Sequence, residues 1–538
     1  MTPNTMLALL DGGIAMIRRI GTRTSLALCA FLLMIARACA DDGRPKSVPE
    51  KPYLTIFAAS IDRLRSASET VFDSAGRPDL ANTLNDRLKS YRDLAGIERT
   101  KPLGVMTTWD DDSPAEIVFV PTDGIGELLK TATFDVLGFH AVSDDHYEIE
   151  RPGSPYHVII KKDYAFFADR VSSIRGLRVT PNLLTQGLRD RYDLVVNYDL
   201  RQIPQPTKSR FTAGVRRQIE PWLQPHDDEA EESANFRKAL GQLVLDLIER
   251  VVLDTRSLTF GGRIDPKTHH LSLEVVIESI SKSQMANSLN RLTTHRSEFS
   301  SMIQPDVPAG LALNLPIGGL VEKIVGSKDG ATKKASGLEA GLQFAGSSAG
   351  DLSLIAALNG PDAADLNDAI PHLILKLEKS GHFIKVNENF DIHHGVAFHS
   401  LTPRELPTAI TQWTGSNVEI IVGQGKQTIW IGIGQPAPLL DRLMEAINRV
   451  DETPSTKTTG SLVRARIQAR TFPELVSTDL LVPDAETARE IFSHGDDGFS
   501  LTVEPVPDGL KLRLDFEEGF IRLIGRGWIN QIEASKAP

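Results

Sequence analysis

The strongest constraint on the fold is a stretch at residues 257–292, in which two alternating segments flank a turn and a helical pattern follows. Leu258 and Phe260 alternate with polar residues before the turn at 265–267. After the turn, four apolar residues alternate in the same way: Leu271, Leu273, Val275 and Ile277. A period of two is typical of a strand with one buried face, so the stretch predicts a β-hairpin followed by a helix.

The same pattern recurs along the chain, which predicts an internally repeated α+β fold. Hairpin-then-helix patterns occur at residues 103–133, 257–292, 342–379, 418–450 and 499–528. A strand and a helix precede three of them, at residues 193–250, 310–325 and 462–492. We therefore expect tandem modules of antiparallel β-hairpins, each followed by a helix that packs on it. A large α+β protein without duplication is the alternative, because it would contain as many hairpins.

Helical spacing of apolar residues near the N-terminus predicts an αα-hairpin before the modules. Its helices are expected at residues 53–72 and 78–91, after a polar tether at 41–51. A chain of 538 residues exceeds one ordinary domain. The expected segments are a signal peptide at 1–40, the tether and helical hairpin at 41–101, and α+β modules at 102–180, 181–300, 301–450 and 451–538.

The first 40 residues have the pattern of a secretory signal peptide. Arg18 and Arg19 precede an apolar segment at 25–35, and the small-residue pattern Ala38-Cys39-Ala40 follows it. We expect cleavage after Ala40 and export to the periplasm or the cell surface. Two alternatives stay open at this point, namely translation from Met16 and lipidation of Cys39.

Composition excludes several kinds of chemistry. The only two cysteines, Cys29 and Cys39, lie inside the signal peptide, so the mature chain is expected to lack thiols, disulfides and cysteine-bound metals. The net charge of −11 argues against nucleic-acid binding. After residue 40 no apolar run approaches the length of about 18 residues that a membrane span needs, so we expect no transmembrane anchor after cleavage.

Four short motifs accompany the export signal: IER at 97–99, KPLGV at 101–105, FVP at 119–121 and YAFF at 164–167. With these motifs the chain resembles a set of uncharacterised exported bacterial proteins of planctomycete type. The resemblance covers most of the mature chain and implies an exported compartment and a shared fold. The resemblance provides no catalytic pattern that could be transferred to this sequence.

Two groups of polar residues are candidates for metal binding. They are His140, Asp144 and His146 in the first group, and Asp391, His393 and His399 in the second. Histidine and carboxylate side chains are metal ligands, but a site needs them on converging, rigid elements. The adjacent His393 and His394 are expected to point to opposite faces of a strand. Exposed histidines in turns are the alternative for both groups.

Known catalytic patterns are incomplete or out of context. The segment 346–350 matches G-x-S-x-G, but a strand rather than a helix is expected after it, so no nucleophile elbow is predicted. The acidic run at 110–112 lacks the glycine and the final glutamate of a calcium loop. The segment 326–334 lacks the spacing of a phosphate-binding loop. We expect no cofactor, and the catalytic residues stay unknown.

These patterns together favour an exported, non-enzymatic envelope protein that acts as a binding or structural module. Repeated α+β units offer broad sheet surfaces for a protein partner or an apolar ligand of the cell envelope. The alternative is an exported hydrolase whose carboxylates and histidines meet only in the folded structure.

Overall fold

The computed structural model describes residues 51–534, apart from 83–85, 87–93, 111–112, 125–126, 129–138, 151–154, 225–230, 293–297, 316–337, 347–349, 360–369, 371–382, 406–410, 412, 453–459 and 473–484. The predicted signal peptide, the loop at 326–337 and most of the helices predicted at 124–133 and 362–379 lie outside these residues. The chain divides into two compact units. Unit 1 comprises Met1–Met285, Ser477–Ile491 and Glu517–Pro538, and unit 2 comprises Ala286–Val476 and Phe492–Phe516.

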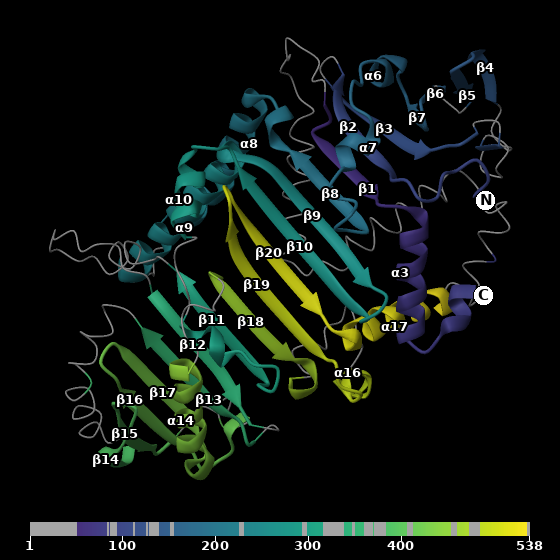
Figure 1. The fold of residues 1–538 in the computed structure, drawn as a ribbon. Helices are drawn as coiled ribbons and strands as arrows, with labels where there is room; N and C mark the ends of the chain where they lie inside the picture. The colour runs from purple at the N-terminus through teal and green to yellow at the C-terminus, as the bar shows by residue number, and fades with distance from the viewer. Residues whose placement is uncertain are drawn as a thin grey trace. The chain divides into compact units, whose positions relative to one another are not determined.

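Unit 1 contains an antiparallel sheet, and its ten described strands follow the order β10-β9-β8-β1-β2-β3-β7-β6-β5-β4 (Figure 1). Their bounds are β1 Leu54–Ala58, β2 Leu103–Asp110, β3 Ser113–Pro121, β4 Phe139–Ser143, β5 His146–Ile149, β6 Tyr156–Lys161, β7 Tyr164–Ala168, β8 Leu194–Asp199, β9 Thr255–Asp265 and β10 His270–Ser279. One face carries an apolar cluster under the short helix α6 (Val171–Arg175), and it includes Phe57, Phe119, Phe166, Ile159 and Ile174.

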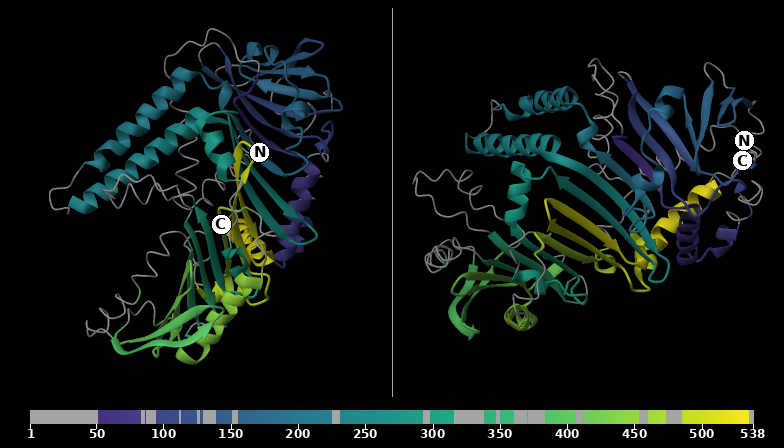
Figure 2. Two further views of the ribbon diagram at one scale, coloured as in Figure 1. Left: turned by 60° about the vertical axis from the view of Figure 1, so that its left-hand side comes forward. Right: turned by 45° about the horizontal axis from the view of Figure 1, so that its top comes forward.

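Unit 1 contains further helices besides α6. They are α3 (Ile61–Ser74), α7 (Pro181–Thr185), the 3-10 helix η2 (Leu200–Gln202), α8 (Gln205–Leu223), α9 (Glu231–Asp254) and α17 (Glu518–Ala534). Helices α8 and α9 run side by side as a long hairpin (Figure 2). The Arg216 guanidinium donates to Glu249 Oε1 at 2.5 Å between them. Val252 of α9 and Phe211 of α8 belong to a second apolar cluster with Leu258 of β9.

Unit 2 also contains an antiparallel sheet, with its ten described strands in the order β20-β19-β18-β11-β12-β13-β17-β16-β15-β14. Their bounds are β11 Ala309–Leu315, β12 Leu338–Ala345, β13 Ser353–Asn359, β14 Phe383–His393, β15 Val396–Pro403, β16 Glu419–Gln424, β17 Thr428–Gly434, β18 Val463–Gln468, β19 Gly498–Val506 and β20 Gly509–Phe516. The 3-10 helices η3 (Phe299–Met302) and η4 (Ala469–Thr471) and the helix α14 (Pro436–Glu452) complete it.

The core of unit 2 lies between its sheet and the helix α14. Leu439 and Leu443 of α14 are fully buried against Trp430, Phe398 and Ile421 of the sheet. Two further helices span the boundary of the units along the chain: α10 (Gln284–Leu292) lies mainly in unit 2, and α16 (Ala485–Phe492) lies mainly in unit 1. Helices and antiparallel strands together make an α+β fold, as the hairpin-then-helix patterns in the sequence predicted.

The N-terminal prediction of a helix from residue 53 is wrong for its first part. Residues Leu54–Ala58 form the strand β1, which is hydrogen-bonded to β2 on one side and to β8 on the other. The helix α3 begins only at Ile61, where the Ser60 hydroxyl accepts a hydrogen bond from the Arg63 backbone N–H at 3.1 Å. Leu54 and Phe57 are spaced as in a helix, but pairing with two neighbouring strands outweighs so short a local pattern.

The predicted modules are not confirmed as packing units. Helix α17 follows the β19–β20 hairpin along the chain, yet it packs on α3 of unit 1, where Trp528 and Ile529 contact Phe72. The expectation that each helix packs on the preceding hairpin is therefore wrong for α17.

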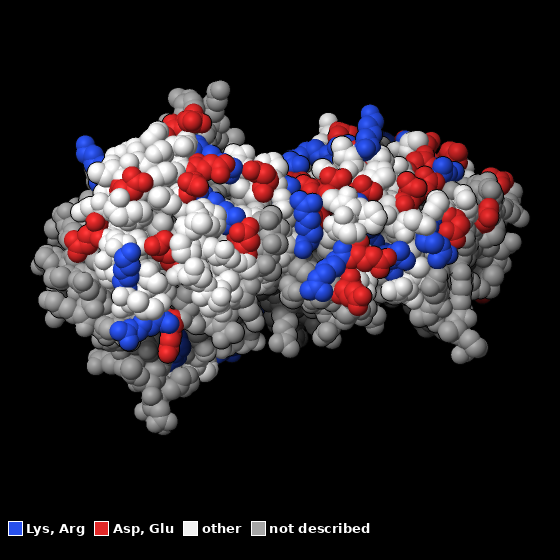
Figure 3. Space-filling model, turned by 90° about the horizontal axis from the view of Figure 1, so that it is seen from below, with Lys and Arg blue, Asp and Glu red and all other residues white. Residues whose placement is uncertain are grey.

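On the face of the molecule drawn in Figure 3, basic and acidic side chains of the described residues are interspersed rather than gathered by sign.

Candidate metal centre

The strands β4, β5 and β6 bring polar side chains together on one face of the unit 1 sheet. In β5, His146 and Glu148 alternate with Tyr147 and Ile149. Tyr147 and Ile149 join an apolar cluster with Val158 of β6 on the opposite face. Because successive side chains of a strand point to opposite faces, burying the apolar residues directs His146 and Glu148 to the same side.

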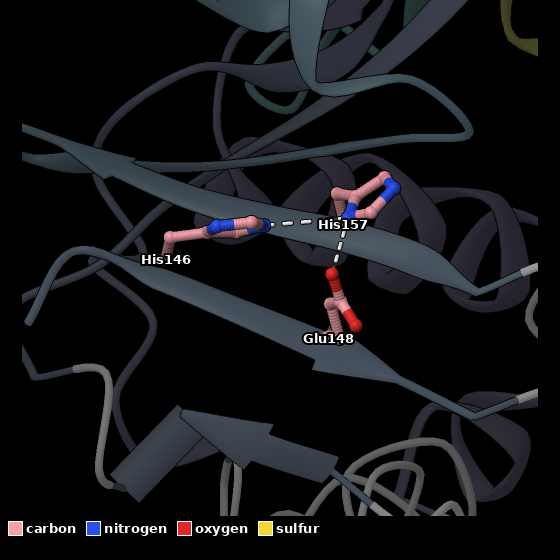
Figure 4. A group of neighbouring side chains, drawn as sticks. All are labelled: His146, Glu148 and His157. Carbon is pink, nitrogen blue, oxygen red and sulfur yellow. Dashed lines mark hydrogen bonds and ion pairs between the residues drawn. The ribbon is translucent and has the colours of Figure 1, made fainter. Parts of the chain in front are cut away.

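The strand register places three side chains next to one another. Glu148 lies directly across from His157 of β6, and His146 lies two residues before Glu148 on β5, across from Ile159. His157 Nδ1 is 3.3 Å from Glu148 Oε1 and 3.3 Å from His146 Nε2. Figure 4 shows the His146 ring and the Glu148 carboxylate both directed at the ring of His157. Among the described residues this is the group of His, Cys, Asp and Glu able to hold a metal ion, with all three ligand atoms within 4.8 Å of one another.

The cluster lies at the border between core and solvent. His146 is 6% exposed, whereas the side chains of His157 and Glu148 are 15% and 26% exposed. Burial lowers the pKa of His146, and the neighbouring His157 lowers it further. A lowered pKa keeps this imidazole neutral at physiological pH, which is the protonation state that binds a metal.

Through a hydrogen bond, His157 Nδ1 can serve only one of its two neighbours at a time. One nitrogen, His157 Nδ1, faces both His146 Nε2 and Glu148 Oε1. If this nitrogen carries a proton, the two acceptors compete for it, and if it carries none, it has nothing to donate to the carboxylate. A cation among the three atoms would accept electron pairs from all of them.

Two of the three distances in the cluster fit such a cation. Bonds of 2.0–2.1 Å in a tetrahedral zinc site place two donor atoms roughly 3.3 Å apart. Both distances from His157 Nδ1 have this value. Two imidazole nitrogens and one carboxylate oxygen are also a donor set that zinc prefers, and three protein ligands leave one coordination position for water or another ligand.

His140 is close to the cluster but does not join the three ligands. It lies on β4 directly across from Glu148, and its side chain is 53% exposed. His140 Nε2 is 3.2 Å from Glu148 Oε2, the oxygen that does not face His157. His140 therefore contacts the second oxygen of this carboxylate, which is where a supporting partner of a metal ligand would lie.

The first predicted group is thus brought together in part. His146 is a member of the cluster and His140 supports it. Asp144 is not, because it lies in the turn between β4 and β5 and is exposed. Its neighbour Asp145 stabilises this turn, accepting a hydrogen bond from the Ser143 hydroxyl at 2.8 Å.

The second predicted group is not brought together. His393 Nε2 lies 2.7 Å from Asn448 Oδ1, and Asp391 Oδ1 accepts the Ile392 backbone N–H at 2.7 Å. His399 is 3% exposed, and its Nδ1 accepts the Asn389 backbone N–H at 3.4 Å. These side chains have separate partners, so they form no shared site.

One expectation about this second group is wrong. His393 and His394 do not point to opposite faces, since their ring centroids are 4.5 Å apart. His394 lies in the β14–β15 turn with a φ of 49°, outside the strand geometry that the expectation assumed. His394 Nδ1 contacts Asp451 Oδ2 at 2.7 Å, so both rings are tied to α14.

Two ligands of the cluster were missed from the sequence. Glu148 follows His146 with the spacing of two that a strand face requires, and this was the available signal. His157 comes from the next strand, and only the β5–β6 register brings it opposite Glu148. The segment 346–350 lies between the paired strands β12 and β13, as expected, although its serines lie outside the described residues.

Comparisons of the chain with protein-family models, with curated proteins and with solved structures found no match. No helix in the described part of the chain has both the length and the apolar character needed to cross a membrane.

Proposed function

We propose that the protein is an exported, non-enzymatic envelope protein that binds a divalent transition-metal ion, with zinc as the preferred ion. The observation that supports metal binding is the convergence of His146 Nε2, Glu148 Oε1 and His157 Nδ1 within 4.8 Å. The three side chains stand on paired strands rather than on loops, so the ligand atoms are held in place before the metal arrives.

The test uses the mature chain from Asp41, with bound metal first removed by a chelator. Zinc titrated into this protein is expected to bind at one ion per chain by calorimetry. Because zinc binds only the folded state, at about 100 times its dissociation constant it should stabilise that state by about 2.7 kcal/mol. The midpoint of thermal unfolding should rise accordingly.

The variant His157→Gln removes one ligand atom, and we expect it to abolish both the binding and the thermal shift. His270→Gln is the matched control, because His270 is an exposed histidine on a strand of the same unit. If His157→Gln bound zinc as tightly as the parent, this proposal would be wrong.

A second function, metal-assisted hydrolysis, is favoured by the number of ligands. A His2Glu set leaves a position for a metal-bound water, and such water is acidic enough to supply hydroxide near neutral pH. The zinc-loaded protein would then hydrolyse activated esters or peptides faster than the His157→Gln variant does. If the two proteins hydrolysed these substrates at equal background rates, hydrolysis would be ruled out and metal binding would remain as the proposed function.

A further inference from the structure

The described strands of the two units have the same order. The strand at each position in the sheet of unit 1 corresponds to the strand at the same position in unit 2, and the number of the second strand is higher by ten. Within each sheet, all neighbouring strands are antiparallel. The connections agree as well. A 3-10 helix follows directly on β8 and on β18, and an α-helix follows β7 and β17. Ten strands can be ordered in many ways, so the repetition of one order is strong evidence of a common origin.

Backbone hydrogen bonds outside the regular ladders repeat too. The last residue of β8, Asp199, donates to Tyr53 O at 2.9 Å, and the last residue of β18, Gln468, donates to Pro308 O at 2.8 Å. Both acceptors directly precede the first strand of their unit. Two further hydrogen bonds of unit 1 have an equivalent in unit 2, and all four are 2.8 Å long. The bond from Ala59 N to Asp193 O corresponds to the bond from Asn314 N to Leu462 O. The bond from Asp193 N to Gly262 O corresponds to the bond from Leu462 N to Val503 O.

The strand registers extend this equivalence across both sheets. In unit 1, one row of directly opposed residues runs Phe57, Gly104, Phe119, Phe166, Ile159, His146. In unit 2, the row at the same positions runs Ala312, Gly341, Ala357, Trp430, Gly423, Phe398. Both rows have glycine in second place and an aromatic residue in fourth place.

We infer that the chain is a tandem duplication of one ten-stranded unit, and that the cluster of His146, Glu148 and His157 is a specialisation of the first copy. The repeat is larger than a hairpin module, and it runs from β1 to β10 and from β11 to β20. That the specialisation serves metal binding rests on the proposed function; the duplication does not.

The strand registers also show which residues occupy the equivalent positions in the second copy. His146, Glu148 and His157 correspond to Phe398, Ser400 and Ile421. These three residues are only 0%, 2% and 1% exposed, so this part of the sheet is closed in the second copy.

Helix length explains the difference between the copies. In the second copy α14 has 17 residues and packs on Phe398 and Ile421 through Leu439 and Leu443. In the first copy the helix at the same place in the chain, α6, has only 5 residues. The short helix leaves the outer strands partly open to solvent, and there polar ligands replace apolar core residues.

A crystal structure of the mature chain tests the duplication directly. Superposing β1–β10 on β11–β20 is expected to overlay the equivalent pairs, among them Tyr53 with Pro308, Asp193 with Leu462 and Phe166 with Trp430. Two different strand orders, or registers that separate these pairs, would overturn the inference.

An exchange variant tests the specialisation. His146→Phe, Glu148→Ser and His157→Ile together give the first copy the residues of the second. We expect cooperative unfolding with a midpoint no lower than that of the parent, together with complete loss of zinc binding. Loss of cooperative unfolding would overturn the equivalence of these positions.

The reverse exchange is the matched control. Phe398→His, Ser400→Glu and Ile421→His would place polar groups beneath α14, so we expect a marked fall in the unfolding midpoint. An unchanged midpoint would contradict the closed face in the second copy. If the parent binds no zinc, the proposed function fails, while normal folding of the first exchange variant still supports the duplication.

Discussion

Each oxygen of the Glu148 carboxylate has a histidine beside it, and the two histidines have different roles. His157 Nδ1 lies 3.3 Å from Oε1, the oxygen that would bind the proposed metal, while the exposed His140 lies 3.2 Å from Oε2. A carboxylate held at its second oxygen keeps its orientation when the first oxygen binds a metal. We therefore expect His140 to support the proposed metal site through Glu148 without being one of its three ligands.

His140→Ala tests this supporting role. Removing the imidazole frees the Glu148 carboxylate to rotate, so zinc affinity should fall by about 10- to 100-fold without being lost. His140→Gln retains an N–H donor and should lose less. Calorimetric titration of both variants checks the expectation, and an affinity equal to that of the parent in His140→Ala would contradict it.

In unit 2, the carboxyl group of Glu339 has an altered pKa. Burial raises the pKa of Glu339 to about 7, and the neighbouring Glu298 carboxylate adds to the rise. Glu339 Oε1 accepts the Glu298 backbone N–H at 3.3 Å, and the Asn359 side chain donates to Glu298 Oε2 at 2.9 Å. Between the ordinary pKa of 4.5 and about 7, the folded protein holds a proton here that the unfolded chain releases.

Glu339→Gln should therefore be stabilising only at high pH. A carboxyl group with a raised pKa in the folded state loses its contribution to stability as pH rises from 4.5 to about 7. At pH 8 we expect the variant to be more stable than the parent by an amount on the order of 1 kcal/mol, after allowance for solvent screening of this partly exposed group. Near pH 4.5 the two proteins should unfold alike.

Denaturant unfolding at the two pH values measures this difference. Glu116→Gln, which changes an exposed carboxylate on β3, is the control and should have the same effect at both. A gain in stability for Glu339→Gln that did not depend on pH would rule out the titration of Glu339 as its cause.

Among the elements, the crossing of α17 on α3 shows how closely two helices can approach. A Cβ added at Gly525 would lie 2.6 Å from Ala75 Cβ and 2.7 Å from Val71 O. These distances are too short for any side chain, so glycine is required where the helices meet. Two residues further along α17, a Cβ at Gly527 would meet nothing within 4 Å.

The two glycines form a matched pair for mutation. Gly525→Ala forces the helices apart and should destabilise the protein by about 1–3 kcal/mol. Gly527→Ala meets no neighbour and should stabilise it by about 0.5–1 kcal/mol, because alanine favours the helix. Thermal unfolding distinguishes the two, and a stabilising Gly525→Ala would show that α17 does not pack on α3.

For the whole molecule, the charge and apolar pattern before residue 41 leads to a prediction about processing. N-terminal sequencing of the exported protein should begin at Asp41. Since both cysteines precede that residue, a reducing agent should leave the midpoint of thermal unfolding unchanged. An intact N-terminus on protein from the cytoplasm, or a clear shift on reduction, would contradict cleavage after Ala40.

Much of the fold could be predicted from local patterns. The pattern at 257–292 became β9, β10 and α10, and the helix predicted at 437–450 became α14. The strand β1 was mistaken for a helix because five residues are too few to separate the two periods. The strand β4 was not foreseen, although His140 within it was a candidate.

Periodicity along the chain determined the fold class, the elements and their buried faces, because hydrophobic burial acts on each segment locally. The spacing of two between His146 and Glu148 also suffices to put both side chains on one face of a strand, although the prediction did not include Glu148. Only the tertiary structure decided that His157 lies across from Glu148, since strand register depends on pairing between segments. The order of ten strands in each unit was likewise decided by pairing over long separations, which no local pattern records. The repeat therefore appears in hydrogen bonds and registers rather than in matching residues.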